Sequence, residues 1–175
     1  MATTIRRIVP EDWARARDLR LEALADPAAS VAFLSTLDDA LARPDAFWID
    51  RAARASEGGE VLQLLAEDHG ALVGSVGVLV MQAGEDDYLG APVTERRATL
   101  IGVFVRSAAR GAGVLDVLVE AACDWAAEQG FDRLVLDVHA NNSRARAAYA
   151  RLGFTATGLE VETEMGRELR LARAL

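Results

Sequence analysis

The chain has 175 residues, of which 51% are hydrophobic and 26% charged, so we expect one globular domain over residues 1–175 with a substantial core. Its net charge of −8 argues against nucleic acid as a partner, because a phosphate backbone needs a basic surface. No apolar run approaches the roughly 20 residues that cross a bilayer, and residues 1–7 lack the apolar stretch of a secretory signal, so we expect no membrane partner and a cytoplasmic location.

The first third of the chain predicts one short strand followed by helices. The strand is expected over residues 5–9, after which a proline and two acids open a helix whose apolar residues recur at helical spacing up to Leu24. The signals are weaker over residues 27–59. There, Ser35-Thr36 is suited to cap a short helix, and Pro44 is suited to begin another.

The remainder of the chain predicts six strands and two helices. The strands are expected over residues 61–66, 71–81, 98–105, 134–138, 154–157 and 168–172, and the helices over 114–129 and 142–152. The strands before and after the first of these helices need a crossover and are therefore expected to be parallel. Hairpin signals elsewhere predict antiparallel neighbours, so the fold class is a mixed α/β sheet.

The most informative stretch is residues 103–114, where an apolar run ends in a polar loop and a glycine-containing turn opens into a helix. Gly111 and Gly113 remove side chains where backbone can approach an anion, and the amides from Gly111 to Asp116 are expected to be unpaired. The turn predicts a phosphate cradle to which Arg110 adds a cation. The alternative is a strand-to-helix turn that needs glycine only for its shape. A P-loop is excluded, because Gly-Lys-Ser/Thr is absent.

A second stretch, residues 142–154, reads Asn-Ser-Arg-Ala-Arg-Ala-Ala-Tyr-Ala-Arg-Leu-Gly-Phe. Together the two stretches resemble the core of the GNAT superfamily, the acyl-CoA-dependent N-acyltransferases. The family pattern is Arg/Gln-x-x-Gly-x-Gly/Ala, and Arg110 and Gly113 occupy its first two fixed positions. Leu115 stands at the final Gly/Ala position and Ser107 replaces a frequent proline. One side of the cradle is therefore expected to be crowded.

The resemblance implies a mostly antiparallel central sheet that is flanked by helices and contains one splayed parallel strand pair. The pantetheine arm of coenzyme A would insert between the splayed strands, and Gly102 marks the expected bulge. Acetyl-CoA is implied as co-substrate, without a metal. The residues implied for coenzyme binding are Val103, Phe104, Val105, Arg110, Gly111, Ala112, Gly113, Val114, Leu115, Asp116 and Asn142. For residues 103–105 alone, a plain core strand fits equally well.

The resemblance also implies catalytic roles. Tyr149 matches the family tyrosine that protonates the leaving thiolate, since a phenol of pKa about 10 stays protonated at neutral pH; a half-buried core tyrosine is the alternative. Asn142 matches the asparagine that bonds the pantetheine arm, and helix N-capping is its competing use. Asp137 and His139 alternate onto one side of their strand, and both are candidate general bases. The alternatives are a surface aspartate and a hydrogen-bonded histidine.

The acceptor pocket is expected to come from residues 27–59, the loop at 83–97 and the C-terminal hairpin. Four aromatic residues lie in these segments, most of them expected to be core: Phe33, Phe47, Trp48 and Tyr88. The loop at 83–95 is acidic and rich in turn residues, so we expect it to be exposed. Its acids, Glu85, Asp86 and Asp87, are more typical of a solvated run than of a cation site.

These observations predict an N-acetyltransferase that moves an acetyl group from acetyl-CoA to a primary amine by direct attack in a ternary complex. The amine would belong to a small molecule or to a protein N-terminus. The alternative from another class is a non-catalytic acyl-CoA-binding sensor or partner module on the same fold. A nucleotide-phosphate-binding regulator is a third interpretation. The expected partners are the coenzyme A thioester and the amine, and a homodimer stays open.

Overall fold

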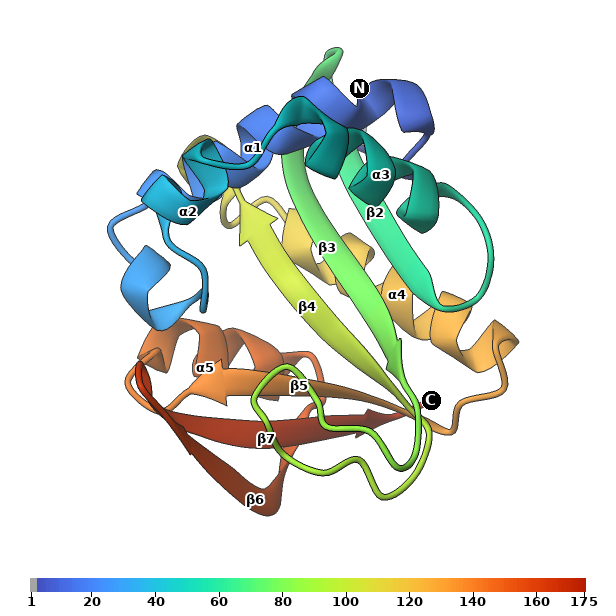
Figure 1. The fold of residues 1–175 in the computed structure, drawn as a ribbon, viewed down its shortest axis with the longest axis vertical. Helices are drawn as coiled ribbons and strands as arrows, with labels where there is room; N and C mark the ends of the chain where they lie inside the picture. Colours follow the sequence, from blue (N-terminus) through green and yellow to red (C-terminus); the bar gives the residue numbers. More distant parts are fainter. Residues whose placement is uncertain (1–2) are drawn as a thin grey trace.

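The computed structural model describes residues 3–175 and contains a seven-stranded sheet between two layers of helices (Figure 1). In chain order the strands are β1 (Thr4–Arg7), β2 (Val61–Asp68), β3 (Ala71–Met81), β4 (Arg97–Val105), β5 (Arg133–His139), β6 (Thr155–Thr163) and β7 (Gly166–Ala174). Their order across the sheet is β1-β2-β3-β4-β5-β7-β6. Only β4 and β5 pair in parallel, which confirms the predicted mixed and mostly antiparallel sheet.

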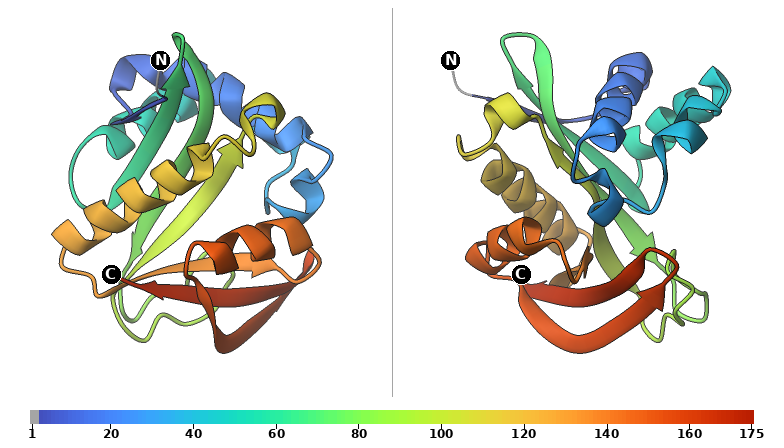
Figure 2. Two further views of the ribbon diagram at one scale, coloured as in Figure 1. Left: turned by 180° about the vertical axis from the view of Figure 1, so that it is seen from behind. Right: turned by 90° about the vertical axis from the view of Figure 1, so that its left-hand side faces the viewer.

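Helices cover the two faces of the sheet unequally (Figure 2). One face carries the three helices from the first third of the chain, α1 (Trp13–Ala25), α2 (Leu37–Leu41) and α3 (Asp45–Ser56). The other face carries α4 (Val114–Glu128) and α5 (Ser143–Arg151). The apolar core is divided in the same way, because α4 and α5 pack on one cluster of buried residues and α1 and α3 pack on a second. The sheet therefore separates two clusters of buried apolar residues.

The parallel pair β4–β5 splits part-way along its length. Its pairing covers three residues of β4 and ends at Leu100, opposite Leu136. Gly102 has φ +59°, and at this point the register of β4 against β3 shifts, so that Phe104 lies opposite Ser75 and Ile101 opposite Gly77. The predicted bulge at Gly102 is confirmed. It turns β4 away from β5 and leaves an opening in the middle of the sheet.

Two expectations fail. The last hairpin, β6–β7, is longer than predicted. The sequence did not indicate the full length of β6, because this edge strand has mostly exposed side chains and shows no alternation of apolar and polar residues. The loop between β3 and β4 is not simply solvated, since the Asp87 side chain is fully buried. Its carboxylate accepts hydrogen bonds from the amides of Leu89 and Ala91 and forms ion pairs with two arginines. None of the helices in residues 3–175 has the length and apolar character to span a membrane.

Candidate active site

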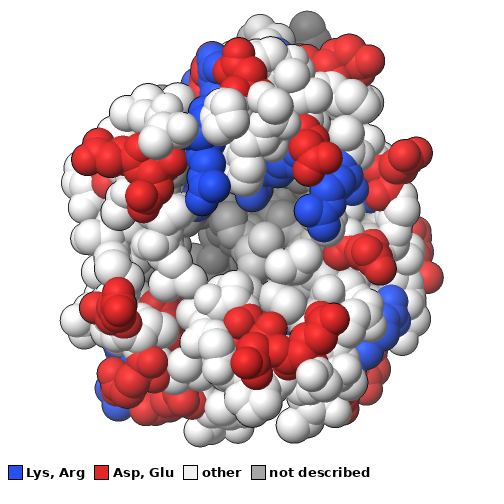
Figure 3. All heavy atoms as spheres, viewed as in Figure 1, with Lys and Arg blue, Asp and Glu red and all other residues white. Residues whose placement is uncertain are grey.

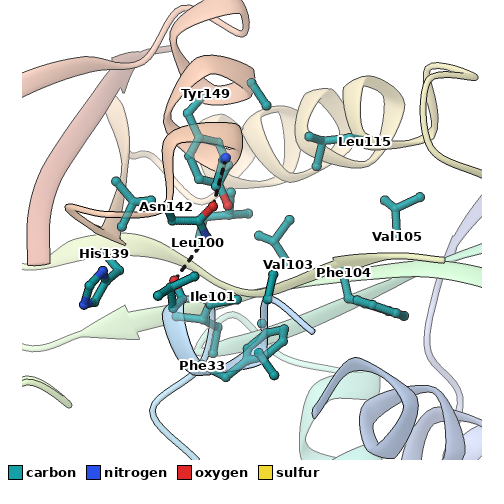
Figure 4. A pocket seen from close by; sticks show the side chains of 18 of the residues that line it. Phe33, Leu100, Ile101, Val103, Phe104, Val105, Leu115, His139, Asn142 and Tyr149 are labelled. Carbon is teal, nitrogen blue, oxygen red and sulfur yellow. Dashed lines mark hydrogen bonds between the residues drawn. The ribbon is translucent and has the colours of Figure 1, made fainter. Parts of the chain in front are cut away.

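A cleft of about 850 Å³ follows the opening between β4 and β5. Its lining comes from both faces of the sheet, and Figure 4 shows Tyr149 and Leu115 on one side of β4, with Phe33 and Phe104 on the other. All of the residues predicted for coenzyme binding or catalysis line this cleft except Ala112. A smaller cavity of about 350 Å³ lies next to it, between α1, α3 and the sheet.

The turn before α4 exposes a short run of backbone donors. None of the amides from Gly111 to Leu115 donates a hydrogen bond within the described chain, and they stand at the start of a fifteen-residue helix. The amide of Asp116 bonds the carbonyl oxygen of Gly113 at 3.1 Å, so the predicted free run is one residue too long. Gly111 and Gly113 have φ of +81° and +80°, and a Cβ at either would meet nothing within 4 Å. The turn is therefore open to an anion.

The arginines beside this turn are mostly engaged. Arg110 donates to the Val105 carbonyl oxygen at 2.8 Å and to Asp26 at 2.6 Å, so its guanidinium braces the turn. Arg151 pairs with both oxygens of Asp116, at 2.7 and 2.8 Å. Arg144, in the first turn of α5, is exposed along the cleft and forms no ion pair with residues 3–175. Sequence reasoning missed Arg144, although its place beside Asn142 was a usable signal.

Tyr149 of α5 is 8% exposed, and its ring points from the helix toward β4 (Figure 4). It packs edge-on against Phe154, with ring centroids 5.8 Å apart. Burial raises the pKa of the phenol, which therefore stays protonated at neutral pH. The hydroxyl has no hydrogen-bond partner among the described residues and borders the cleft. The Tyr149 hydroxyl is thus free to donate a hydrogen bond into the cleft.

Asn142 joins the two sides of the cleft. Its Oδ1 accepts the Ala145 amide at 3.1 Å and caps α5, which confirms the capping alternative. Its Nδ2 donates to the Val31 carbonyl oxygen at 3.1 Å, in the segment between α1 and α2. The residue therefore fixes the helix that carries Tyr149 against the acceptor side.

The two candidate bases are buried and hydrogen-bonded. Asp137 has a side chain 2% exposed and accepts from Arg170 at 2.8 and 3.0 Å and from the Tyr88 hydroxyl at 2.7 Å, so the surface-aspartate alternative is wrong. His139 accepts the Asn141 amide on Nδ1 at 3.1 Å, so its proton lies on Nε2 and is donated to the Met165 carbonyl oxygen at 2.9 Å. The hydrogen-bonded histidine alternative is confirmed.

A third acidic group, Glu168 of β7, was missed. It lies opposite His139 in the β5–β7 ladder, lines the cleft and is 8% exposed, but no described residue donates a hydrogen bond to its carboxylate. Burial raises the pKa of Glu168, the His139 ring lowers it and the Asp137 charge raises it. The sequence of β7 could have indicated this residue, because Glu168 and Arg170 alternate with two leucines and therefore share one face of the strand.

The four aromatic residues named for the acceptor pocket lie at two different cavities. Phe33 and Tyr88 line the large cleft, whereas Phe47 and the buried Trp48 border the smaller cavity. Within residues 3–175, no group of three His, Cys, Asp or Glu side chains is placed to hold a metal ion.

The model of the Acetyltransferase (GNAT) family matches residues 13–154, most of the chain. The chain belongs to the GNAT acetyltransferase family. It is also similar to N-acetyltransferase 8 of Homo sapiens, with 33% identity over 94 residues. That match covers 54% of this chain and 38% of the human protein, so the chain corresponds to well under half of that relative's length.

Solved GNAT structures share the whole fold. An acetyltransferase of the GNAT family from Streptococcus pneumoniae superposes with a TM-score of 0.77 at 20% identity, covering 99% of both chains. The PaiA N-acetyltransferase of Thermoplasma acidophilum, solved in complex with coenzyme A, gives a TM-score of 0.77 at 15% identity over 100% of both chains. At these identities the likeness establishes the fold alone.

Proposed function

We propose that this GNAT protein transfers an acetyl group from acetyl-CoA to a primary amine by direct attack in a ternary complex. The observation that carries the proposal is the unpartnered Tyr149 hydroxyl beside the opening between β4 and β5, with the free amides at 111–115 along the same cleft. The structural likeness to an N-acetyltransferase solved with coenzyme A supports the choice of coenzyme. Family membership supports acetyl transfer.

In this proposal the coenzyme binds largely to backbone. The amides at 111–115 hold the diphosphate, the positive end of α4 adds to the attraction, and Arg144 supplies a free cation. The pantetheine arm runs along the edge of β4 that β5 leaves unpaired, at Val103 and Phe104. An amide on this edge polarises the thioester carbonyl. The Val105 carbonyl oxygen is already used by Arg110.

The reaction needs a neutral amine and a protonated leaving group. The neutral amine attacks the thioester carbonyl, the C–S bond breaks, and the Tyr149 hydroxyl gives its proton to the leaving thiolate; the phenolate takes back the proton that the nitrogen loses as the amide forms. A thiolate expelled beside this buried phenol is itself poorly solvated, which offsets the raised pKa of the tyrosine. We assign the removal of the ammonium proton to Glu168, whose carboxylate is unbonded. Asp137 and His139 remain alternatives that act through water, since their lone pairs accept hydrogen bonds.

The test measures free thiol released from acetyl-CoA with a panel of primary amines, together with the acetylated product by mass spectrometry. Amine-dependent thiol release with a matching mass increase is expected. If calorimetry shows coenzyme binding while no amine gives a product, the chain is an acyl-CoA-binding module and the proposed reaction fails.

A further inference from the structure

Two arginines on the acceptor side have no carboxylate partner in residues 3–175: Arg20 of α1 and Arg51 of α3. Both line the large cleft and also the smaller cavity, so they stand where the two spaces meet. Two other arginines of the cleft, Arg110 and Arg151, are each paired with an aspartate. The lack of counter-ions thus distinguishes Arg20 and Arg51 from these two neighbours.

The Arg20 guanidinium is held in a fixed position. It lies 4.3 Å from the ring centroid of Phe33, and its Nη2 donates to the Ser35 hydroxyl at 2.8 Å. Burial and then the positive charge of Arg51 lower the pKa of Arg20 to about 10, so it remains charged at neutral pH. Arg51 forms no hydrogen bond with a described residue, and the surrounding protein lowers its pKa as well. Most of the donors of both groups are unused.

Such an arrangement costs free energy in the protein alone. The two like charges repel each other, the half-buried Arg20 loses part of its hydration, and Arg51 stays exposed to solvent, while no paired acid within residues 3–175 offsets either charge. The net charge of the chain is −8, so acids are abundant, but none pairs with these two groups. An anionic ligand would supply the missing partner, and arginine matches planar oxyanions in geometry.

We propose that Arg20 and Arg51 bind an anionic group of the acceptor, so that the substrate is a small primary amine that also carries a carboxylate or a phosphonate. This inference rests on the proposed acetyl transfer. Glu168 is the unbonded acid of the same cleft, and it would face the ammonium while the two arginines face the oxyanion. Figure 3 shows the hollow on this side of the molecule, with basic groups on its rim beneath α1 and α3.

The protein's overall charge favours a simple cationic amine over a zwitterion. A surface of net charge −8 attracts a cation, whereas an amino acid without net charge gains no such attraction and depends on local groups such as the two arginines. Unpaired arginines would be a disadvantage in a pocket for diamines. They are an advantage only where the substrate itself is negatively charged at one end.

The experiment compares kcat/KM for matched acceptors with acetyl-CoA. The panel contains free α-amino acids, the corresponding amino acid amides, aminoalkylphosphonates and aliphatic diamines. We expect the acids to exceed their own amides by at least about 10-fold, because a charge-assisted hydrogen bond is lost in the amide. The ratio of carboxylates to phosphonates identifies which oxyanion the site accepts.

Variants then locate the effect. Arg20→Gln and Arg51→Gln are expected to lower kcat/KM for the anionic amines by about 10- to 100-fold and to leave the amides nearly unchanged. Arg51→Glu is expected to shift the preference toward diamines. Arg43→Gln is the matched control, because Arg43 is exposed after α2, outside both cavities, and its loss changes the net charge equally. Melting temperatures verify that each variant folds.

The outcomes separate the two proposals. Equal turnover of acids and amides, or a preference that neither arginine variant alters, overturns this inference and leaves acetyl transfer intact. If no amine is acetylated, the proposed reaction fails. Calorimetry with the amino acids and aminophosphonates then tests whether Arg20 and Arg51 bind an anion. Binding that is lost in Arg20→Gln supports an anion site, and no binding to the unmodified protein overturns it.

Discussion

On the α4–α5 side the cleft offers mainly backbone groups, whereas on the α1–α3 side it is built from side chains of distant segments. The free amides at 111–115 and the unpaired edge of β4 come from one continuous stretch of chain. The acceptor side combines Arg20 of α1, Arg51 of α3 and Glu168 of β7. A site made of backbone suits a coenzyme common to a whole family, and a site made of side chains allows the acceptor to differ among relatives.

The two sides also differ in charge pairing. Arg110 and Arg151, beside the turn before α4, are each paired with an aspartate. Asp137 is likewise neutralised by Arg170, which also binds the buried Asp87. Three groups without partners in residues 3–175, Arg20, Arg51 and Glu168, lie toward the acceptor, whereas Arg144 is unpaired on the coenzyme side. Unpaired charge therefore marks where a charged group of a ligand is expected.

The largest effect is expected from Gly113→Glu on the coenzyme side. Gly113 has φ +80°, which strains any side chain there, and a carboxylate beside the free amides would repel the diphosphate. Calorimetry should show coenzyme A affinity reduced by about 100-fold or more. Gly58→Glu is the control, since Gly58 has φ +74°, has nothing within 4 Å of an added Cβ and lies outside the cleft. Retained affinity in Gly113→Glu would make the turn purely structural.

Tyr149→Phe is expected to separate chemistry from binding on the same side. Removing the hydroxyl should lower kcat by about 100-fold, a typical effect for a general acid, while coenzyme A affinity stays within about 2-fold. The chain has two tyrosines, and Tyr88→Phe is the matched control in the same cleft. Tyr88 bonds Asp137, so a smaller loss is expected there. Equal losses in the two variants would contradict the assigned role of Tyr149.

The two sides also differ in what the sequence could reveal. The coenzyme side was predicted nearly completely, because the glycine turn, the bulge at Gly102 and the helix of Tyr149 each depend on local patterns. Three points depart from the prediction: the Asp116 amide is bonded, Ala112 does not line the cleft, and Arg110 pairs with Asp26. The catalytic roles of these residues stay predictions.

The acceptor side could not be predicted in the same way. Asp87 looked like part of a solvated run, yet Arg97 and Arg170 bury it from other strands. The roles that we propose for Glu168 and Arg51 depend on the lack of a hydrogen-bond or ion-pair partner for either side chain within residues 3–175. Such absences become visible only when the packing of distant segments is known.

A smaller effect is expected from Glu168→Gln. Burial raises the pKa of Glu168, so kcat/KM of the unmodified protein should fall with decreasing pH at a pH above the usual glutamate pKa of about 4.3. The variant should lose this dependence and about 10-fold in kcat/KM at neutral pH. Glu160→Gln on the exposed strand β6 is the control. An unchanged pH profile in Glu168→Gln would move the proton acceptor to Asp137 or His139.

Glu168→Gln is also expected to raise the stability of the fold at neutral pH. A carboxyl whose pKa is raised on folding binds its proton more tightly in the folded state, so ionised Glu168 destabilises the fold above its unfolded pKa. Glu168→Gln should therefore melt at a higher temperature than the unmodified protein near pH 7. The difference should shrink as the pH falls and vanish well below the unfolded glutamate pKa of about 4.3, where the carboxyl is protonated in both states. A variant that melts lower at neutral pH would show that Glu168 has a stabilising partner.

The smallest effect concerns Asn142, which connects the two sides. Asn142→Ser keeps a side-chain cap on α5 but loses the bond to the Val31 carbonyl oxygen, worth about 1 kcal/mol, and Asn142→Ala loses the cap as well, worth about 1 kcal/mol more. Chemical denaturation should show these two steps. If the residue only links the sides, acceptor KM rises a few-fold in both variants and coenzyme affinity is unchanged. A drop in coenzyme affinity already in Asn142→Ser would instead show that the amide contacts the pantetheine arm, and the bridge to Val31 would then be exchanged for that contact when the coenzyme binds.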